Sequence, residues 1–399
     1  MRPAQAARTY PFREPAGLAL EPEYAHLRDH EPLSRISLPY GGDAWLAVRH
    51  EDVRTVLSDP RFSRAAILDR DVPRASPRRH TDPTLHTVDP PEHTRLRRLV
   101  AAAFSPRQVG RLTEHARHVT DTLLDRVEEH GPPADLIGGL AIPLPVAVIC
   151  QMLGVPVADR EQFASWIDVA LATTAFTSEE IHAAFAALRD YLTGLVAARR
   201  REAGDDLLSA LVQARDTDGR LSEDELVGLG VTLLYAGLET TTSELGNAVY
   251  TLLTHPDQLA LLRADPGLVD RAVDELLRFN PLVTSAGFTR IALEDVELGG
   301  VLVRAGEAVM VQLDAANRDD RVFPRPDDLD LTRRPNPHLA FGFGLHYCVA
   351  AQLAKAEMRV ALGALLRRFP ALRLAEGADE LPWRRGRMAR GLDRLPVTW

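Results

Sequence analysis

Helical patterning dominates this chain from residue 92 onward and limits the folds that are open to it. Apolar residues recur every three or four positions, which is the spacing of one face of an α-helix. Proline or glycine separates most of these segments. The pattern predicts helices over 92–104, 107–129, 140–153, 159–172, 178–201, 205–214, 222–254, 256–263, 267–279 and 351–368.

Strand-like patterns are fewer and lie mostly outside this helical part. Residues 35–38 and 44–48 flank a turn with two glycines and predict a β-hairpin. Short strands are also expected within 284–312, where Gly299 and Gly300 make a tight turn. Short helices are expected near 21–29 and 50–57. We find no internal repeat or linker, so the chain is expected to be mainly α with small β-sheets, in a single domain over residues 1–399.

Composition excludes several classes of protein. Of the 399 residues, 45% are hydrophobic and 26% charged, which is typical of a globular chain with a large core. The net charge of −9 offers no basic face for nucleic acid. Two cysteines cannot form a disulfide framework, so a reducing, cytoplasmic environment is expected. Cys150 lies in an apolar run and is expected in the core.

Residues 136–158 carry no charge over a length that could cross a bilayer. They contain Pro143 and Pro145, and Asp135 and Asp159 flank them, so we expect a buried helix after a proline-rich turn. The first 15 residues have no apolar segment before their prolines and are not a signal peptide. No membrane association is expected.

Residues 61–91 show no sustained periodicity and contain several prolines. A long structureless loop in a compact fold is usually functional, often as a lid over a pocket. The loop also carries five arginines, for which a solvated basic surface is favoured over an anion-binding site: Arg64, Arg70, Arg74, Arg78 and Arg79.

Cys348 is the residue with the most distinctive chemical setting. It ends a glycine-containing run that starts at Phe341 and precedes an apolar helical pattern. Gly342 and Gly344 permit backbone conformations and close approaches that a Cβ would resist. A helix N-terminus favours the thiolate over the thiol. Such a thiolate is either a nucleophile or a metal ligand, and the loop alone leaves both open.

The run Ala236-Gly237-Leu238-Glu239-Thr240 interrupts the longest apolar helix. The Thr240 hydroxyl can donate to the carbonyl of Ala236, which bends helices. A buried polar site and a simple packing kink explain this run equally well.

Two other motifs carry little information singly. Glu275 and Arg278 are three residues apart and form an acid–base pair on one helix face. His93 and Arg97 are four apart, so they share a face that could hold an anionic group.

Taken together and in this order, Phe341-x-x-Gly344-x-His346-x-Cys348, the Glu-x-x-Arg pair and the Ala-Gly-x-Glu-Thr run resemble the cytochrome P450 haem-thiolate monooxygenases. The resemblance extends over most of the chain and includes the run from Asp89 to Arg95. It is closest in style to the soluble bacterial, actinobacterial-like members. It implies the cytochrome P450 fold, with haem between the long helix that contains Thr240 and the helix that follows Cys348.

The resemblance also implies roles for individual residues. Cys348 would be the axial thiolate ligand of haem b, which pushes electron density to the iron and favours O–O cleavage in this family. The haem propionates and ring would contact His93, Arg97, Arg290, His346, Phe341, Gly342, Ala236 and Gly237. The catalytic pair would be Thr240, at the oxygen site, and Glu239, as a proton relay. A structural network behind the cysteine loop would consist of Glu275, Arg278 and Arg333. The family usually has Gly two residues after the cysteine and Pro four after it, where this chain has Ala350 and Gln352.

The implied reaction inserts one oxygen atom from O2 into a C–H bond or double bond of a hydrophobic small molecule. Electrons would come from NAD(P)H through a ferredoxin reductase and ferredoxin. Relatives of this style tailor polyketides, terpenoids or peptides, as in antibiotic biosynthesis. Substrate contacts are expected from the 64–88 loop, the 163–188 helix pair, residues 282–288, and individually from Leu234, Leu238, Val283, Thr284, Ala286, Met388 and Ala389. A basic patch for ferredoxin is expected from Arg95, Arg98, Arg107 and Lys355.

Four alternatives were weighed against this interpretation. A peroxide-driven haem enzyme on the same scaffold should lack the Glu239–Thr240 pair. A non-enzymatic haem or gas sensor would normally carry a fused output domain, for which we find no spare segment. A cysteine hydrolase would use Cys348 with His346 as base, but two residues of separation is poor evidence for such a pair. A zinc site would need further cysteine ligands.

Overall fold

The computed structural model describes residues 6–14, 17–68, 70–217 and 219–399. The first five residues and residue 15 of the segment excluded as a signal peptide lie outside the described residues. The described helices are α1 Pro22–His30, α2 His50–Ser58, α3 Glu92–Ala101, α4 Pro106–His130, α5 Pro143–Leu153, α6 Arg160–Ala170, α7 Ser178–Arg201, α8 Leu207–Asp216, α9 Glu223–Thr254, α10 Pro256–Ala264, α11 Val269–Phe279, α12 Leu313–Ala316 and α13 Ala351–Arg368.

The described strands are short, with at most five residues each. They are β1 Arg8–Thr9, β2 Leu33–Ser37, β3 Asp43–Ala47, β4 Phe62–Ser63, β5 Ala134–Asp135, β6 Arg290–Ala292, β7 Val296–Leu298, β8 Val301–Val303, β9 Ala308–Val311, β10 Arg373–Leu374 and β11 Pro396–Thr398. The predicted fold class, mainly α with small β-sheets, is confirmed.

Helix ends follow the local sequence chemistry. Helices α7 and α9 begin where the pattern predicts because each has a capping box, formed by Thr177 with Glu180 and by Ser222 with Glu225. Helix α5 begins at Pro143 rather than at residue 140, since proline is favoured in the first turn. It ends at Gly154, whose φ of 71° is the left-handed conformation that glycine adopts readily.

The largest sheet has six strands in the order β1-β2-β3-β9-β6-β4. The predicted hairpin of β2 and β3 is confirmed, as is the antiparallel pair β7–β8 around Gly299 and Gly300. The expectation of a structureless loop over 61–91 is wrong at its start. Phe62 and Ser63 form β4 and pair with Ala292 and Ile291 of β6, because this dipeptide finds a partner strand far away in sequence.

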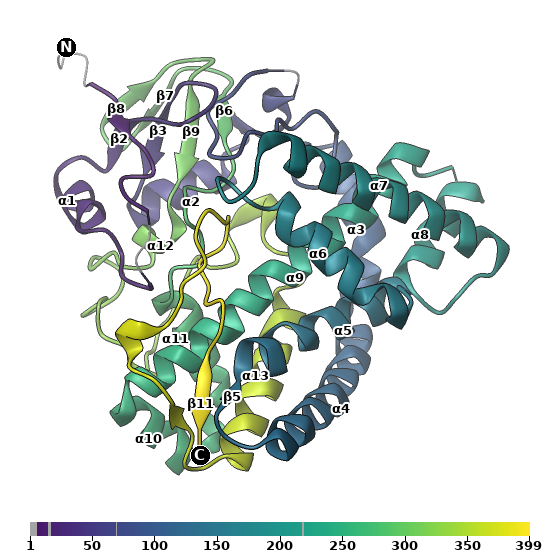
Figure 1. Ribbon diagram of the computed structural model, residues 1–399. Coiled ribbons are helices and arrows are strands. Elements are labelled where there is room, and N and C mark those ends of the chain that lie inside the picture. The colour runs from purple at the N-terminus through teal and green to yellow at the C-terminus, as the bar shows by residue number, and fades with distance from the viewer. Residues whose placement is uncertain (1–5, 15–16, 69, 218) are drawn as a thin grey trace.

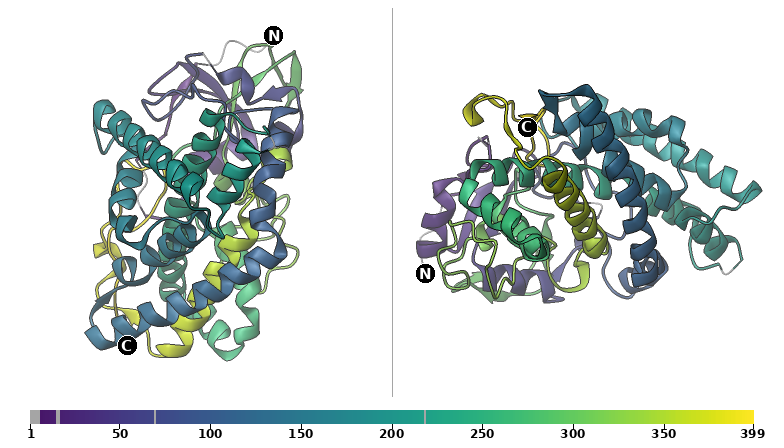
Figure 2. Two further views of the ribbon diagram at one scale, coloured as in Figure 1. Left: turned by 90° about the vertical axis from the view of Figure 1, so that its right-hand side faces the viewer. Right: turned by 90° about the horizontal axis from the view of Figure 1, so that it is seen from below.

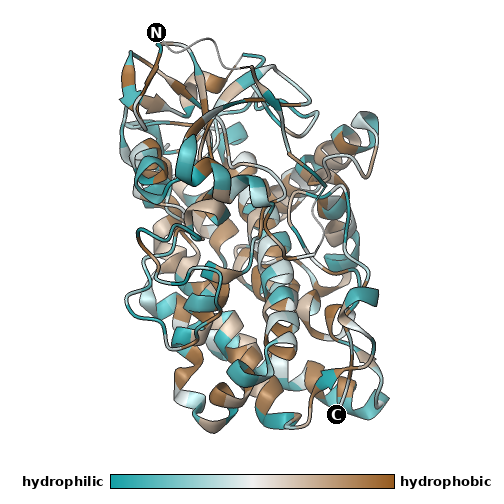
Figure 3. Ribbon diagram, turned by 90° about the vertical axis from the view of Figure 1, so that its left-hand side faces the viewer, coloured by the Kyte–Doolittle hydropathy of each residue, from teal (hydrophilic) through white to brown (hydrophobic). Residues whose placement is uncertain are grey.

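The sheet and the helices occupy different ends of the molecule. In Figure 1 the six-stranded sheet lies toward the N-terminus, while α4, α5, α9, α11 and α13 form the helical part, near the C-terminus. Helices α4 and α13 lie side by side, as the left view of Figure 2 shows. The helices carry alternating hydrophobic and hydrophilic stretches (Figure 3), and their apolar faces build the largest core cluster.

Two further expectations concern the apolar segment 136–158. Cys150 is 1% exposed within the helical core, as predicted. Among the described helices, none combines the length and apolar character that a membrane crossing requires.

Candidate functional site

The loop that delivers Cys348 is fixed by its backbone. Gly342 and Gly344 have φ values of 73° and 72°, which favour glycine. A Cβ at Gly344 would lie 2.6 Å from the carbonyl oxygen of Leu57, so the loop packs directly against the end of α2. The N–H of Cys348 donates to the carbonyl of Phe341 at 2.9 Å, which closes the loop just before α13.

The expectation that the helix N-terminus favours the thiolate of Cys348 is not met, because the pKa of this thiol is raised. Burial raises the pKa of the Cys348 thiol, while the N–H of Ala350 and the Arg97 cation act in the opposite direction. Burial therefore outweighs the helix N-terminus in this structure. A coordinating metal ion deprotonates a thiol outright, so this thiol suits a metal ligand better than a free nucleophile.

The two residues after the cysteine that depart from the family pattern lie at the start of α13, where they do not disturb the helix. Ala350 is the residue that caps the start of α13, with φ −93° and ψ 6°. Gln352 is exposed in the first turn of that helix. Proline is tolerated in a first turn but is not required there, so α13 starts normally without it.

Four segments bring buried cationic and imidazole groups together beside this loop. They are Arg64 after β4, His93 in α3, Arg290 in β6, and His346 in the 3₁₀ turn Gly344–His346. The rings of His93 and His346 are 4.4 Å apart. Burial, followed by the Arg64 and Arg290 cations, lowers the pKa of His346 to about 2. We call these four residues the cation cluster.

The cation cluster lacks anionic partners within the described protein. Arg64 and His93 are 3% and 2% exposed, yet Nε and Nη2 of Arg64 and Nε2 of His93 have no hydrogen-bond partner there. Burial lowers the pKa of Arg290 to about 10, opposed by Asp89. The Asp89 carboxylate already accepts from Ser63 Oγ and from the N–H groups of Arg64 and Ala65. Buried unpaired donors are costly, so the donor set fits a bound group with carboxylates.

Arg97 lies one turn along α3 from His93. Burial lowers the pKa of Arg97, and the Cys348 thiol acts against that shift. The predicted set of His93, Arg97, Arg290 and His346 is therefore brought together around Cys348.

Arg64 is the member that sequence reasoning missed. The 61–91 loop was interpreted as a solvated basic surface, and this is wrong for Arg64 because β4 pairs with β6 and draws it inside. Arg79 of the same loop does fit that interpretation, with 55% of its side chain exposed. The missed signal was the strand-like Phe62-Ser63 pair just before Arg64.

Helix α9 presents the predicted acid–threonine pair. The Thr240 hydroxyl donates to the Ala236 carbonyl at 2.8 Å, as predicted. Thr240 is exposed, whereas the neighbouring Glu239 is 7% exposed and its Oε1 has no partner among the described residues. Gly237 packs closely, since a Cβ there would meet the Ile149 side chain at 3.2 Å.

The surroundings of Glu239 shift the pKa of its carboxyl group. Burial raises its pKa to about 7, while the Arg384 cation and the N–H of Ala389 favour the charged form. Arg384 and Arg387 both form ion pairs with Asp168 of α6, the second at 2.8 Å. A carboxyl with this pKa exchanges protons at neutral pH, which suits a relay.

Two segments predicted to contact substrate lie against each other. Val283 forms a β-bridge with Ala389, and the N–H of Thr284 donates to the Met388 carbonyl at 3.0 Å. Ala286 is 7% exposed. From α9, Leu238 and Leu234 are 5% and 0% exposed and belong to the helical core.

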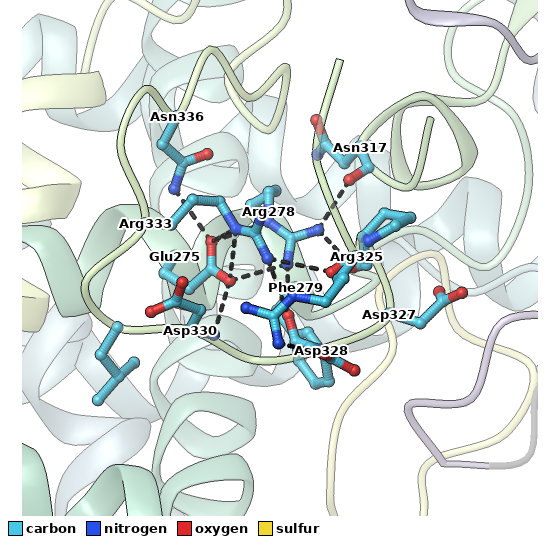
Figure 4. A network of polar contacts seen from close by, with 12 residues as sticks. Glu275, Arg278, Phe279, Asn317, Arg325, Asp327, Asp328, Asp330, Arg333 and Asn336 are labelled. Carbon is cyan, nitrogen blue, oxygen red and sulfur yellow. Dashed lines mark hydrogen bonds and ion pairs between the residues drawn. The ribbon is translucent and has the colours of Figure 1, made fainter. Parts of the chain in front are cut away.

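The Glu275–Arg278 pair is buried, unlike most pairs at this spacing. Glu275 Oε1 accepts from Arg278 Nη2 at 2.8 Å and from Arg333 Nε at 3.1 Å. Asn336 and the backbone N–H of Asp330 complete the shell around Glu275, and Figure 4 shows how these groups converge. The network joins α11 to the segment 317–336 that leads into the cysteine loop.

The expected basic patch is partly neutralised. Arg95 is paired with Glu225, and Lys355 lies 2.5 Å from Asp274. Arg98 and Arg107 are exposed. Arg98 and Arg95 line a surface hollow of about 830 Å³ beside α3.

The family model of cytochrome P450 matches residues 161–383. The chain is 54% identical to nocardicin C N-oxygenase of Nocardia uniformis subsp. tsuyamanensis, over 98% of each chain. It is 46% identical to mycinamicin IV hydroxylase/epoxidase of Micromonospora griseorubida, again over 98% of each. The crystal structure of HinD with NMFT and NO is similar with a TM-score of 0.96 and 52% identity, over 99% of this chain and 100% of that one.

The half-buried Cys348, held in a fixed loop beside cations that lack partners among the described residues, fits an anionic, metal-containing cofactor. The chain belongs to the cytochrome P450 family and is a cytochrome P450 monooxygenase of the bacterial type. Its cofactor is haem iron, and O2 is its co-substrate.

Proposed function

We propose that this monooxygenase tailors a natural product, such as an antibiotic precursor, by inserting one oxygen atom into a mainly hydrophobic substrate. The observation that carries the proposal is the cation cluster beside Cys348, with buried donors that lack partners. The names of its relatives support the setting, because they include an N-oxygenase and a hydroxylase/epoxidase of antibiotic scaffolds. These names support three possible acceptors of the oxygen atom: a C–H bond, a double bond or an amine nitrogen.

In this proposal Cys348 would be the sulfur ligand of haem b, and the cation cluster together with Arg97 would bind the propionates. Phe341, Gly342, Ala236 and Gly237 would contact the ring. When bound, the haem supplies the activation of O2. One domain over residues 1–399 would hold all of these groups, since they come from residues 64 to 348.

The chain's own contribution to the chemistry lies on α9. The Thr240 hydroxyl, now donating to Ala236 O, can turn to donate at the oxygen site and be resupplied by Glu239. Glu239 has a pKa of about 7, so it can release a proton and recover it from the side of Arg384 and Asp168. Two protons and two electrons reduce the second oxygen atom of O2 to water.

We further propose that the electrons come from NAD(P)H through a ferredoxin reductase and a ferredoxin in the cytoplasm. The docking surface would be formed by α3 and the start of α4, where Arg98 and Arg107 respectively remain exposed. An acidic ferredoxin suits these cations. The opposing candidate is peroxide-driven catalysis, which the Glu239–Thr240 pair argues against; a faster turnover with hydrogen peroxide alone than with ferredoxin would favour it.

Two experiments test the proposed function. The spectrum of the reduced, CO-treated protein should show the strongly red-shifted Soret band of a thiolate ligand, and Cys348→Ser should lose it. Thr240→Ala should raise the fraction of electrons released as hydrogen peroxide several-fold, because proton delivery at the oxygen site is lost. Thr242→Ala, two residues further on another face of α9, is the control and should keep normal coupling. Unchanged coupling in Thr240→Ala would contradict the proposal.

A further inference from the structure

Four aromatic side chains from distant segments form a continuous row next to the oxygen site. Phe185 of α7 lies 6.2 Å from Tyr235 of α9, measured between ring centroids, and Tyr235 lies 6.2 Å from His86. His86 lies 5.5 Å from Phe288. The His86 Nδ1 and the Tyr235 hydroxyl are 3.3 Å apart. We call Phe185, Tyr235, His86 and Phe288 the aromatic row.

The members of the row keep accessible surface. Phe288 is 37% exposed, and Phe185, Tyr235 and His86 are half-buried. Each ring therefore keeps part of its surface available to contact a flat apolar group, as ligand sites lined by aromatic residues do.

An arginine caps each end of the row. Arg64 lies 4.3 Å from the Phe288 ring and Arg78 lies 3.8 Å from the Phe185 ring. Arg64 belongs to the cation cluster, and the proposed contact with the propionates explains why a cation is present there. Arg78 has no such role, and its guanidinium makes no hydrogen bond or ion pair with any described residue.

The charges around Arg78 compensate it only in part. Arg78 is half-buried, and burial lowers its pKa while Asp82 acts in the opposite direction. The Asp82 carboxylate is shared with Arg189, which lies 3.5 Å from it. Burial also lowers the pKa values of His80 and His86 to about 3 and about 4, so both are neutral at pH 7. Arg78 is thus the cation at its end of the row.

The row connects this cation to the helix that carries Thr240. Tyr235 precedes Ala236 and is five residues before Thr240 on the same helix. Five helical residues span roughly 7.5 Å along the axis. A ligand that lies along the row from Arg78 would therefore reach the oxygen site with an atom several bonds from its anionic end.

We propose that the substrate carries a carboxylate, or a similar anionic group, which Arg78 binds while the aromatic row contacts an aryl or other flat apolar body. Tyr235 and His86 offer additional hydrogen bonds to that end of the molecule. This inference rests on the proposed function and narrows its substrate class. A planar guanidinium stacked on an aromatic ring is well placed for two-point carboxylate binding.

Binding measurements on the haem-loaded protein test this inference. The probes are phenylbutanoic, phenylhexanoic and phenyloctanoic acids, each compared with its primary amide by calorimetry and by the spin-state shift of the Soret band. At least one acid should bind about 10- to 100-fold more tightly than its amide, the range expected of a charged hydrogen bond. Arg78→Gln should abolish that preference, and Arg78→Lys should keep part of it.

Arg79→Gln is the matched control, since it removes the same charge from the adjacent, exposed residue of the same loop. It should leave the preference for the acid unchanged. The inference is wrong if no acid binds more tightly than its amide, or if the preference survives in Arg78→Gln. The CO spectrum and the Thr240→Ala coupling are independent of this result, so its failure would leave the proposed function standing.

Discussion

Single residues show how burial rather than local sequence sets the chemistry of this protein. Glu239 and Glu357 are both buried glutamates, but only Glu239 has charged groups around it, namely Arg384, Asp168 and Arg387. Glu357 of α13 is 5% exposed, its Oε2 lacks a partner among the described residues, and burial alone raises its pKa to about 8. Glu357 therefore carries a cost to stability that depends on pH.

Glu357→Gln should change the pH dependence of unfolding. In the wild type the folded state keeps this carboxyl protonated up to pH of about 8, whereas the unfolded chain releases the proton near its ordinary value of 4.5. Stability from this group is therefore full below 4.5 and falls as pH rises toward 8, by about 1.4 kcal/mol for each pH unit. The variant should lose this slope. Denaturant midpoints at about pH 6 and about pH 9 measure it, and equal pH slopes in both proteins would contradict the assignment.

The same residues mark what sequence reasoning could reach. Cys348, Glu239 and Thr240 were recognised because each lies in a short motif. For Arg64 and Arg78 the sequence predicts only a solvated loop, since no local pattern distinguishes an arginine that folds inward from one that does not. Their burial depends on strand β4 and on rings supplied by α7 and α9, which are contacts distant in sequence.

At the scale of elements, the helices were predictable and the shortest strands were not. Helix α13 was predicted with its observed bounds, since its apolar period extends over many residues. Strands β4, β5 and β10 have two residues each, too few to show an alternation. Similarly, the spacing of Glu275 and Arg278 indicated one helix face of α11, but their burial comes from the segment 317–336 that wraps around them (Figure 4).

Glu275→Ala should destabilise the protein strongly through this element contact. The side chains of Glu275, Arg278 and Arg333 are 1%, 0% and 6% exposed, so the variant leaves two buried guanidinium groups without their carboxylate. The expected loss is about 3–5 kcal/mol of unfolding free energy. Arg304→Ala is the control, because it breaks a pair with Asp295 that is 65% and 46% exposed and should cost less than about 1 kcal/mol. Chemical denaturation compares them, and equal losses would refute a structural role for the network.

For the whole molecule, the cation cluster is the point where the sheet and the helical part meet. Arg64 directly follows β4 and Arg290 lies in the neighbouring strand β6, while His93 comes from α3 and His346 from the loop before α13. Without an anion the buried Arg64 and Arg290 repel each other, and propionates at the proposed site would neutralise them. Haem binding should therefore stabilise the folded protein, because it removes the electrostatic repulsion between the segments that carry these cations.

Arg64→Gln should consequently shift stability in opposite directions in the two forms of the protein. In the haem-free form the variant removes a buried cation that lies near Arg290 and lacks partners for Nε and Nη2, so unfolding free energy should rise by about 1–3 kcal/mol. In the haem-bound form it removes a partner of a propionate, so unfolding free energy should fall by a similar amount and haem should dissociate faster. Arg61→Gln, on an exposed arginine 2.5 Å from Asp59, should change either form by less than about 1 kcal/mol. Denaturant midpoints of both forms measure the effect, and shifts of Arg64→Gln with the same sign in the two forms would show that Arg64 contributes by packing rather than by its charge.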